Sequence, residues 1–276
     1  MSPMQAETGF ASINGAQIYY ETAGRGSPLV MIHAGVADSR QWESEFTRFA
    51  TGNRVVRFDL RNFGRSLPAA GEFRHLDDLT ALLDLLVPDE PVILMGCSIG
   101  GGLAMDYALA HPDRVRGLIM VASSPSGLEL DVPEPENELE QEAIDAFNAG
   151  DLERAAEAEA RIWIDGMGRT PQEVDPVVRA RAIEMNRLAL AHEAGNPGTR
   201  LSGPNDAAGR LPELTLPVLV IVGEHDIPYM HAAAEYMQER LPDARLERMA
   251  GVAHLLNMEK PAEFQQIVAQ FLEEIA

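Results

Sequence analysis

The stretch GCSIG at residues 96–100 decides the fold. It follows an apolar run at residues 92–95 that predicts a strand, and it opens a helical pattern near Ile99. A serine flanked by glycines at a strand-to-helix turn is typical of a nucleophile elbow, because glycines let the strand and the helix approach closely. The start of the helix adds free N–H groups that suit a developing negative charge. The alternative is a glycine-rich turn with an incidental serine.

Cys97, the only cysteine of the chain, is the rival nucleophile. If it stood at the apex of the turn, the flanking positions would be Met95 and Ile99. Both side chains are too large for a tight turn, so Ser98 is the better candidate, and Cys97 is expected to point into the core. A lone cysteine also excludes a disulfide-stabilised scaffold.

Apolar runs of strand length recur on both sides of this turn. Helical patterns separate them, such as residues 76–86, whose apolar side chains are spaced along one face. Continuous apolar strands predict a sheet buried on both faces. Their alternation with helices predicts an α/β fold with a doubly wound, mostly parallel sheet. The predicted strands are residues 17–20, 29–32, 55–58, 92–95, 118–121, 218–222 and 245–249, and further helices are predicted at 103–110 and 264–275.

The middle of the chain interrupts this alternation. Residues 127–210 contain no convincing strand and are rich in alanine and glutamate in helical patterns. We therefore expect a helical cap at 127–210, inserted into an α/β core made of residues 1–126 and 211–276. The core that remains has a sensible size for one domain.

A serine nucleophile needs a base, and the base needs an acid that orients it. His254 lies in a loop between the last predicted strand and the last predicted helix, and Asp226 directly follows the strand before it. Sites in α/β sheets lie at the carboxyl ends of strands. The order serine, acid, histidine along the chain is typical of one triad fold. We therefore expect Ser98, Asp226 and His254 to form a catalytic triad.

Several stretches in the same order carry a family resemblance. They are the elbow, residues 33–42 from a histidine to a tryptophan, the segment DLRNFGRS at 59–66, and the loops at 223–226 and 251–261. In these stretches the chain resembles the α/β-hydrolase superfamily, in its subgroup with a helical cap. The resemblance covers about residues 10–126 and 211–276.

The resemblance also implies where an oxyanion would bind. Its donors would be the backbone N–H groups of Gly35, in the loop after the first parallel strand, and of Ile99, the residue after the nucleophile. Two positions depart from the family pattern, since Ala34 and Asn62 stand where the family usually has glycine.

The identity of the nucleophile narrows the chemistry. Family members that act on alkyl halides or epoxides use an aspartate at the elbow, so Ser98 predicts attack on a carbonyl. We expect a serine hydrolase that cleaves carboxylic esters of small or medium size through an acyl-enzyme. Alternatives are a lactonase similar to enol-lactonases and a hydrolase of carbon–carbon bonds. A ligand receptor or signalling protein on the same fold is the non-enzyme alternative.

Composition limits the partners. The chain has 22 basic and 43 acidic residues, a formal net charge of −21, so neither nucleic acid nor an anionic membrane is an expected partner. No metal-ligand or dinucleotide motif is visible, and we expect no metal and no cofactor. The N-terminal residues show no signal peptide and no run approaches a membrane span, so the expected location is cytoplasmic. A cap helix could pair two chains into a homodimer.

The cap is expected to set substrate choice. Five apolar residues in it could roof a pocket or could instead anchor the cap to the core, and the sequence leaves both readings open. Either of two cap arginines, Arg181 and Arg187, could attract an anionic substrate despite the net charge. The five apolar residues are Phe147, Trp163, Met167, Met185 and Leu188.

Overall fold

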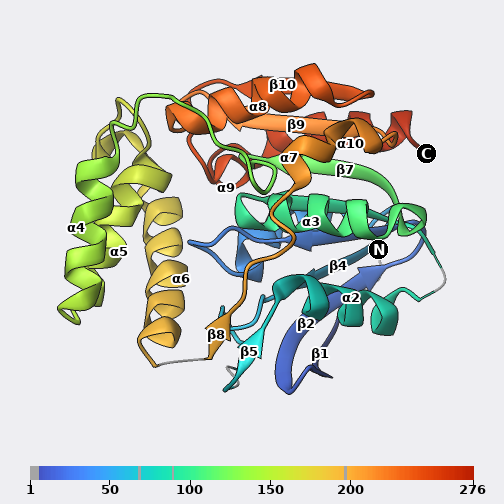
Figure 1. Ribbon diagram of the computed structural model, residues 1–276, viewed down its shortest axis with the longest axis horizontal. Helices are drawn as coiled ribbons and strands as arrows, with labels where there is room; N and C mark the ends of the chain where they lie inside the picture. The colour runs from blue at the N-terminus through green and yellow to red at the C-terminus, as the bar shows by residue number, and fades with distance from the viewer. Residues whose placement is uncertain (1–5, 68–69, 89, 196–197) are drawn as a thin grey trace.

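The computed structural model describes residues 6–67, 70–88, 90–195 and 198–276, and its centre is an eight-stranded sheet (Figure 1). The strand order is β1-β2-β4-β3-β6-β7-β9-β10. The first three strands in that order run antiparallel to one another, and the remaining neighbours pair in parallel. The predicted doubly wound, mostly parallel sheet is confirmed. The strands are β1 (Glu7–Ile13), β2 (Ala16–Gly24), β3 (Pro28–Ile32), β4 (Arg54–Phe58), β6 (Val92–Cys97), β7 (Val115–Val121), β9 (Val218–Gly223) and β10 (Ala244–Met249).

The central strands are apolar throughout because both faces of the sheet are covered. Every residue of β3, β6 and β9 is buried. Successive side chains point to opposite faces, so Val30 and Ile32 belong to one core cluster while Leu29 and Met31 belong to the other. Each of these apolar strands therefore contributes side chains to two cores, one on each face of the sheet.

Helices cover the two faces. One core cluster contains side chains of α2 (His75–Leu86), α3 (Ile99–Ala110) and α8 (Pro228–Arg240). The other contains side chains of α1 (Glu43–Phe49) and α10 (Pro261–Glu274). The predicted helices at 76–86, 103–110 and 264–275 fall within α2, α3 and, but for its last residue, α10. Short elements of the core are η1 (Ser39–Trp42), η2 (Pro112–Arg114), η5 (Leu211–Glu213), α7 (Ala207–Arg210) and α9 (Leu256–Glu259).

Three helices stand beside the carboxyl edge of the sheet, between β7 and β9 in the chain (Figure 1). They are α4 (Asn137–Asn148), α5 (Leu152–Ala160) and α6 (Pro176–Ala194), with the short turns η3 (Arg161–Asp165) and η4 (Pro171–Glu173) between the last two. Helix α5 packs against both others. The division into a cap at 127–210 and a core around it remains our proposal for how these elements are grouped.

One prediction about this segment was wrong. Residues 127–210 do contain a strand, β8 (Thr199–Arg200), which pairs in parallel with β5 (Glu72–Phe73). Thr199 N–H donates to the Gly71 carbonyl, and Leu201 N–H donates to the Phe73 carbonyl. A strand of two residues leaves no alternating pattern, and its partner lies more than a hundred positions away, so the sequence carries no local signal for it.

Candidate active site

Ser98 occupies a sharp turn between β6 and α3. Its backbone has φ 54° and ψ −119°, a conformation that residues with a side chain rarely adopt. A Cβ atom on Gly96 would lie 2.2 Å from the Gly100 carbonyl oxygen, and one on Gly100 would lie 2.5 Å from the Ile32 carbonyl oxygen. The strand and the helix therefore approach so closely that only glycine fits on either side of the serine. This is the physical basis of the GCSIG stretch.

Cys97 is not positioned for chemistry. Its side chain is fully buried, and Sγ donates a long hydrogen bond of 3.7 Å to the His254 carbonyl oxygen. Burial raises the pKa of the Cys97 thiol to about 12. A thiol that stays protonated is a poor nucleophile, so the expectation that Cys97 points into the core is confirmed.

Asp226 and His254 form a buried pair. Nδ1 of His254 lies 3.1 Å and 3.0 Å from the two carboxylate oxygens of Asp226, and both residues are almost fully buried. The Ile227 N–H donates a further hydrogen bond of 2.9 Å to the carboxylate. Because a carboxylate only accepts, Nδ1 of His254 carries the proton. Nε2 of the neutral ring is then free to accept a proton.

Two loops hold this pair together. The His225 N–H donates to the Val252 carbonyl at 2.9 Å, which ties the loop after β9 to the loop after β10. The His254 ring packs against the indole of Trp163, with ring centroids 4.6 Å apart, and the His254 N–H donates to the Trp163 carbonyl at 3.3 Å. The imidazole is therefore fixed from the core side by Asp226 and from the η3 side by Trp163.

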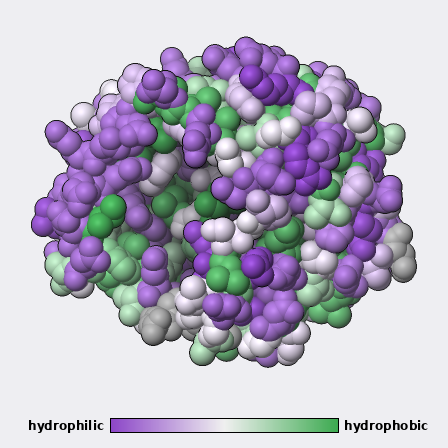
Figure 2. All heavy atoms as spheres, viewed as in Figure 1, coloured by the Kyte–Doolittle hydropathy of each residue, from purple (hydrophilic) through white to green (hydrophobic). Residues whose placement is uncertain are grey.

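Ser98 and His254 line the same cavity. Its volume is about 600 Å³, and its wall includes Gly35, Ile99 and Trp163 as well. Figure 2 shows a hollow in this face of the molecule, beside the helices α4 to α6, with hydrophobic residues inside a largely hydrophilic surround. Within the described residues no hydrogen bond joins Ser98 to His254. Such bonds are often long in ligand-free enzymes and tighten only when substrate is bound.

The loop that follows β3 places Gly35 against Ile99. A Cβ atom on Gly35 would lie 3.5 Å from the Ile99 side chain, so the two predicted oxyanion donors are neighbours at the cavity wall. The adjoining Ala34 is fully buried and its N–H donates to Oε1 of Gln41 at 2.9 Å. No acceptor is bonded to the Gly35 N–H in the part of the chain that the structure describes.

His33 holds this loop in place through two hydrogen bonds. Its Nδ1 donates to the Ala34 carbonyl at 2.8 Å, and its Nε2 accepts from the Leu60 N–H at 2.9 Å. Those two bonds define a neutral tautomer, and burial lowers the pKa of His33, which keeps it neutral. The histidine therefore joins the loop after β3 to the turn after β4.

Both departures from the family pattern fit their places. Asn62 has φ 71°, and asparagine is among the few residues other than glycine that adopt this region readily. Ala34 has no positive φ and is packed in the core, so its methyl group is accommodated. At Gly64, with φ 52°, a Cβ atom would lie 2.3 Å from the Asp59 carboxylate, which accepts from the Arg65 N–H at 2.7 Å.

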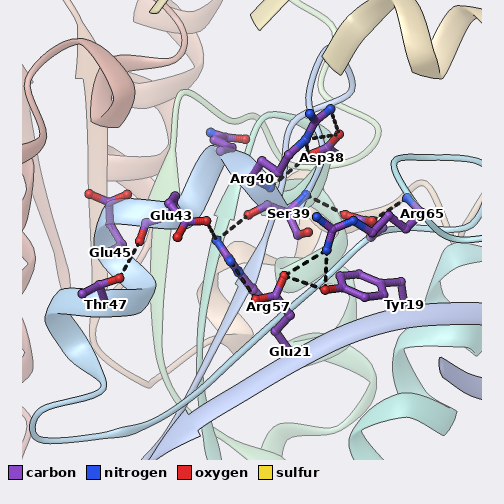
Figure 3. A network of polar contacts seen from close by, with 12 residues as sticks. Tyr19, Glu21, Asp38, Ser39, Arg40, Glu43, Glu45, Thr47, Arg57 and Arg65 are labelled. Carbon is purple, nitrogen blue, oxygen red and sulfur yellow. Dashed lines mark hydrogen bonds and ion pairs between the residues drawn. The ribbon is translucent and has the colours of Figure 1, made fainter. Parts of the chain in front are cut away.

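An arginine network supports the loop from below (Figure 3). Arg57 of β4 forms ion pairs with Glu21 of β2 at 2.7 Å and with Glu43 at the start of α1 at 2.8 Å. Asp38 accepts from the Arg40 backbone N–H and guanidinium. The pair of Arg57 with Glu43 joins the start of α1 to the sheet, and the contacts of Asp38 with Arg40 fix the turn between the loop and η1.

Three charged or polar residues of the cavity wall were not expected at the site, although one of them, Arg61, belongs to the segment DLRNFGRS. Arg61, His75 and Arg200 line the cavity together with Ser98. Arg61 is bound in a two-pronged ion pair to Asp78, with both distances 2.8 Å. No short motif indicates His75 or Arg200, because β5, which ends two residues before His75, and β8, which contains Arg200, come together only in the fold.

The cap residues named from the sequence divide between the two readings. Trp163 lines the cavity, while Met185 is fully buried in the core and Phe147 packs within the cap. Neither Arg181 nor Arg187 is among the residues that line the Ser98 cavity, and Arg187 pairs with a glutamate at 2.7 Å.

The described residues hold neither a cluster of metal ligands nor a membrane-spanning helix. No group of three or more histidine, cysteine, aspartate or glutamate side chains is arranged to hold a metal ion there. No helix in the described ranges is both long and apolar enough to cross a membrane.

Comparison with known proteins places the chain in a class. A family model described as the alpha/beta hydrolase fold matches residues 27–261. The chain therefore belongs to the alpha/beta hydrolase fold family, as its sheet order and strand-to-helix serine turn indicate.

Individual relatives narrow the comparison. The chain is 27% identical over 263 residues to a pimeloyl-[acyl-carrier protein] methyl ester esterase of Nitrosospira multiformis, covering 92% of this chain and 97% of the relative. Among solved structures it is similar to Est816, described as an N-acyl homoserine lactone degrading enzyme, with a TM-score of 0.75, 25% identity and coverage of 96% and 100%. The enol-lactonase from Burkholderia xenovorans LB400 shares the fold, with a TM-score of 0.77, 21% identity and coverage of 96% and 99%.

Proposed function

We propose that Ser98, His254 and Asp226 are the catalytic triad of a serine hydrolase that cleaves carboxylic esters of small or medium size. The protein is a carboxylic ester hydrolase, in keeping with its family and with the relatives named above. The observation that carries the triad is the Asp226–His254 pair beside a serine at a strained turn, with both Ser98 and His254 on one cavity wall. The cavity volume of about 600 Å³ suits a substrate of that size.

The reaction follows from the proton positions. Ser98 Oγ attacks the ester carbonyl carbon while its proton passes to Nε2 of His254. The Asp226 carboxylate keeps the other ring nitrogen protonated and stabilises the imidazolium that forms. Nε2 then returns its proton to the leaving alcohol as the carbon–oxygen bond breaks, which leaves an acyl group on Ser98. Water, activated by the same nitrogen, releases the acid and restores the serine.

The backbone N–H groups of Gly35 and Ile99 bind the oxyanion in this proposal. Ile99 is the first residue of α3, so its N–H has no partner within the helix. The positive end of the helix adds to the stabilisation of the negative oxygen. Removal of one such donor typically raises the barrier by about 2.7–4 kcal/mol.

Lactones are the second candidate substrates. A lactone is a cyclic ester, and the same attack opens its ring without releasing an alcohol from the enzyme. The similarity to Est816, which is described as degrading N-acyl homoserine lactones, favours this candidate over carbon–carbon bond cleavage. We further propose a cytoplasmic location, since the single cysteine of the chain suits a reducing compartment.

The test is hydrolysis of p-nitrophenyl esters of increasing acyl length by the wild type, Ser98→Ala and Cys97→Ala. We expect Ser98→Ala to lose at least 1,000-fold in kcat, and Cys97→Ala to stay within fivefold of the wild type. The chain-length optimum then reports the size of the acyl site.

Two results would overturn the proposal. Equal turnover by the wild type and Ser98→Ala would remove the serine from the mechanism. Loss of activity in Cys97→Ala, with its folding intact by circular dichroism, would assign the nucleophile to the thiol. If neither variant nor wild type turns over p-nitrophenyl esters, the same three proteins are assayed with γ-butyrolactones, and inactivity there as well contradicts ester hydrolysis.

A further inference from the structure

A second cavity adjoins the first at the nucleophile. It has a volume of about 530 Å³ and extends past α3 toward the start of α7. The two cavities share four lining residues, which are His75, Ser98, Ile99 and Arg200. Two of the four belong to the proposed catalytic machinery. The other two, His75 and Arg200, therefore line both cavities together with the nucleophile.

Arg200 is an arginine without an ion pair in a chain with 43 acidic residues. Most arginines of the protein are bound to carboxylates, as Arg61 is to Asp78 at the same cavity. In the described part of the chain, the Arg200 guanidinium has neither an ion pair nor a hydrogen bond. Its backbone is fixed, because β8 pairs with β5. Arg200 is exposed and lines the cavity, so its charge is available to a group that binds there.

His75 lies beside this charge and remains neutral. Burial and the nearby Arg200 lower the pKa of His75 to about 3, so the ring carries no charge at neutral pH. Its Nδ1 is buried and has no hydrogen-bond partner in the structure. Because Nδ1 is enclosed, Nε2 is the atom through which the ring can bond a molecule in the cavity.

Two acidic side chains also line the first cavity. Glu159 of α5 and Glu193 of α6 line it, and Glu159 accepts a hydrogen bond from Asn186 at 2.6 Å. Burial raises the pKa of Glu159, and the Glu193 charge raises it further. A negatively charged substrate group is therefore repelled from the helices and attracted to Arg200. An anionic group that binds in this cavity is therefore expected beside Arg200 and away from the two glutamates.

We propose that Arg200, with His75 beside it, binds a carboxylate carried by the substrate, so that the preferred substrates are esters or lactones with a free carboxylate. This inference rests on the proposed function and names its substrate class. A guanidinium matches a carboxylate with two parallel hydrogen bonds, which fixes orientation as well as charge. The neutral His75 supplies a further polar contact without adding charge.

The experiment compares two esters of matched length, monoethyl adipate and ethyl hexanoate, by titration of released acid at pH 8. The proteins are the wild type, Arg200→Met, Arg200→Lys and Arg181→Met. The last is the control for loss of one positive charge, because Arg181 is not on either cavity wall. We expect Arg200→Met to lose at least tenfold in kcat/KM on monoethyl adipate and less than twofold on ethyl hexanoate. Arg200→Lys should restore part of the loss.

A binding measurement separates this inference from the catalytic proposal. Adipate, the product dianion, is titrated calorimetrically into Ser98→Ala and into the same protein with Arg200→Met. Binding that weakens at least tenfold on loss of Arg200 supports the subsite, even if the catalytic proposal fails. Equal losses on both esters, a wild-type preference for ethyl hexanoate, or equal adipate binding by both proteins would each overturn the carboxylate subsite. If Ser98→Ala keeps full turnover while adipate binding still depends on Arg200, the catalytic proposal fails and the carboxylate subsite stands.

Discussion

Gln41 and Asn257 are 216 positions apart in the chain, and their side chains are hydrogen bonded in the core. Gln41 Nε2 donates to Asn257 Oδ1 at 3.2 Å, and Asn257 Nδ2 donates back to the Gln41 carbonyl at 2.9 Å. The side-chain oxygen of Gln41 accepts from the N–H of Ala34, the residue before Gly35. Asn257 lies in α9, which begins two residues after His254. The pair therefore joins the base loop to the proposed oxyanion loop.

Asn257→Leu is expected to disturb catalysis as well as stability. It leaves the buried amide of Gln41 without its partner, which costs about 1–3 kcal/mol of unfolding free energy. If the pair positions Gly35, kcat should fall at least tenfold with KM changed less than threefold. Ester assays and urea unfolding measure the two effects. The matched control is Gln265→Ala, which removes a neighbouring amide that does not bond Gln41 and should keep kcat within twofold. A loss of stability with unchanged kcat would show a purely structural role.

Glu45 should make the protein less stable as the pH rises. Its side chain is fully buried, and burial raises the pKa of Glu45 from 4.5 to about 7. Between those two values the unfolded chain releases the proton while the folded protein keeps it, so unfolding becomes easier with rising pH. The contribution is at most about 3 kcal/mol, and it is complete above pH 7. Urea unfolding at pH 5 and pH 8 should show a smaller decline for Glu45→Gln than for the wild type. Parallel declines in the two proteins would contradict the assignment.

Breaking the ion pair between Arg169 and Glu259 should be strongly destabilising. The distance is 2.7 Å, and both side chains are less than a tenth exposed. Glu259 also accepts from the Ala253 N–H at 2.7 Å, directly before His254, the proposed base. Glu259→Gln leaves a buried guanidinium without its counter-charge, and we expect a loss of about 3–5 kcal/mol in unfolding free energy. Glu235→Gln, which breaks an exposed pair with Arg248, should change it by less than about 1 kcal/mol. Equal losses of unfolding free energy for the two substitutions would contradict the expectation that the buried pair matters more than the exposed one.

Gly100→Ala tests the closeness of strand and helix at the elbow. Its Cβ atom would lie within 2.6 Å of the carbonyl oxygens of Ile32 and His33, which cannot both move without disrupting β3. We expect little folded protein, or a loss above about 3 kcal/mol. Gly209→Ala is the control, since a Cβ atom there meets nothing within 4 Å. It should be neutral or slightly stabilising, because Gly209 lies within α7. Normal stability of Gly100→Ala in thermal unfolding would contradict the geometry.

The parts of the fold that were predictable from the sequence are those with a local cause. The strands are buried on both faces, so they appear as apolar runs, and the elbow needs glycine at fixed positions around Ser98. The pairing of Asp226 with His254 followed from two strand ends that a parallel sheet places side by side. Each of these features depends on short local stretches of sequence, and the last depends also on the parallel pairing of β9 with β10.

The remaining features depend on contacts between distant segments. Arg200 and His75 come together through β8 and β5, which are two residues each and leave no pattern. The uncharged state of His75 depends on burial and on Arg200, neither of which is visible in the residues around it. For the same reason, only Trp163 of the five suggested cap residues lines the Ser98 cavity, since helix periodicity does not say which surface a face will meet.

The bond from the His254 N–H to the Trp163 carbonyl has a consequence for how substrate reaches the serine. The cap segment around Trp163 is attached to the backbone of the base itself, and Arg169 attaches it again to α9. A hinged lid that swung outward would pull the imidazole out of line at each turnover. Substrate and product are therefore expected to enter and leave through the permanent hollow of Figure 2, while the segment around Trp163 stays in place.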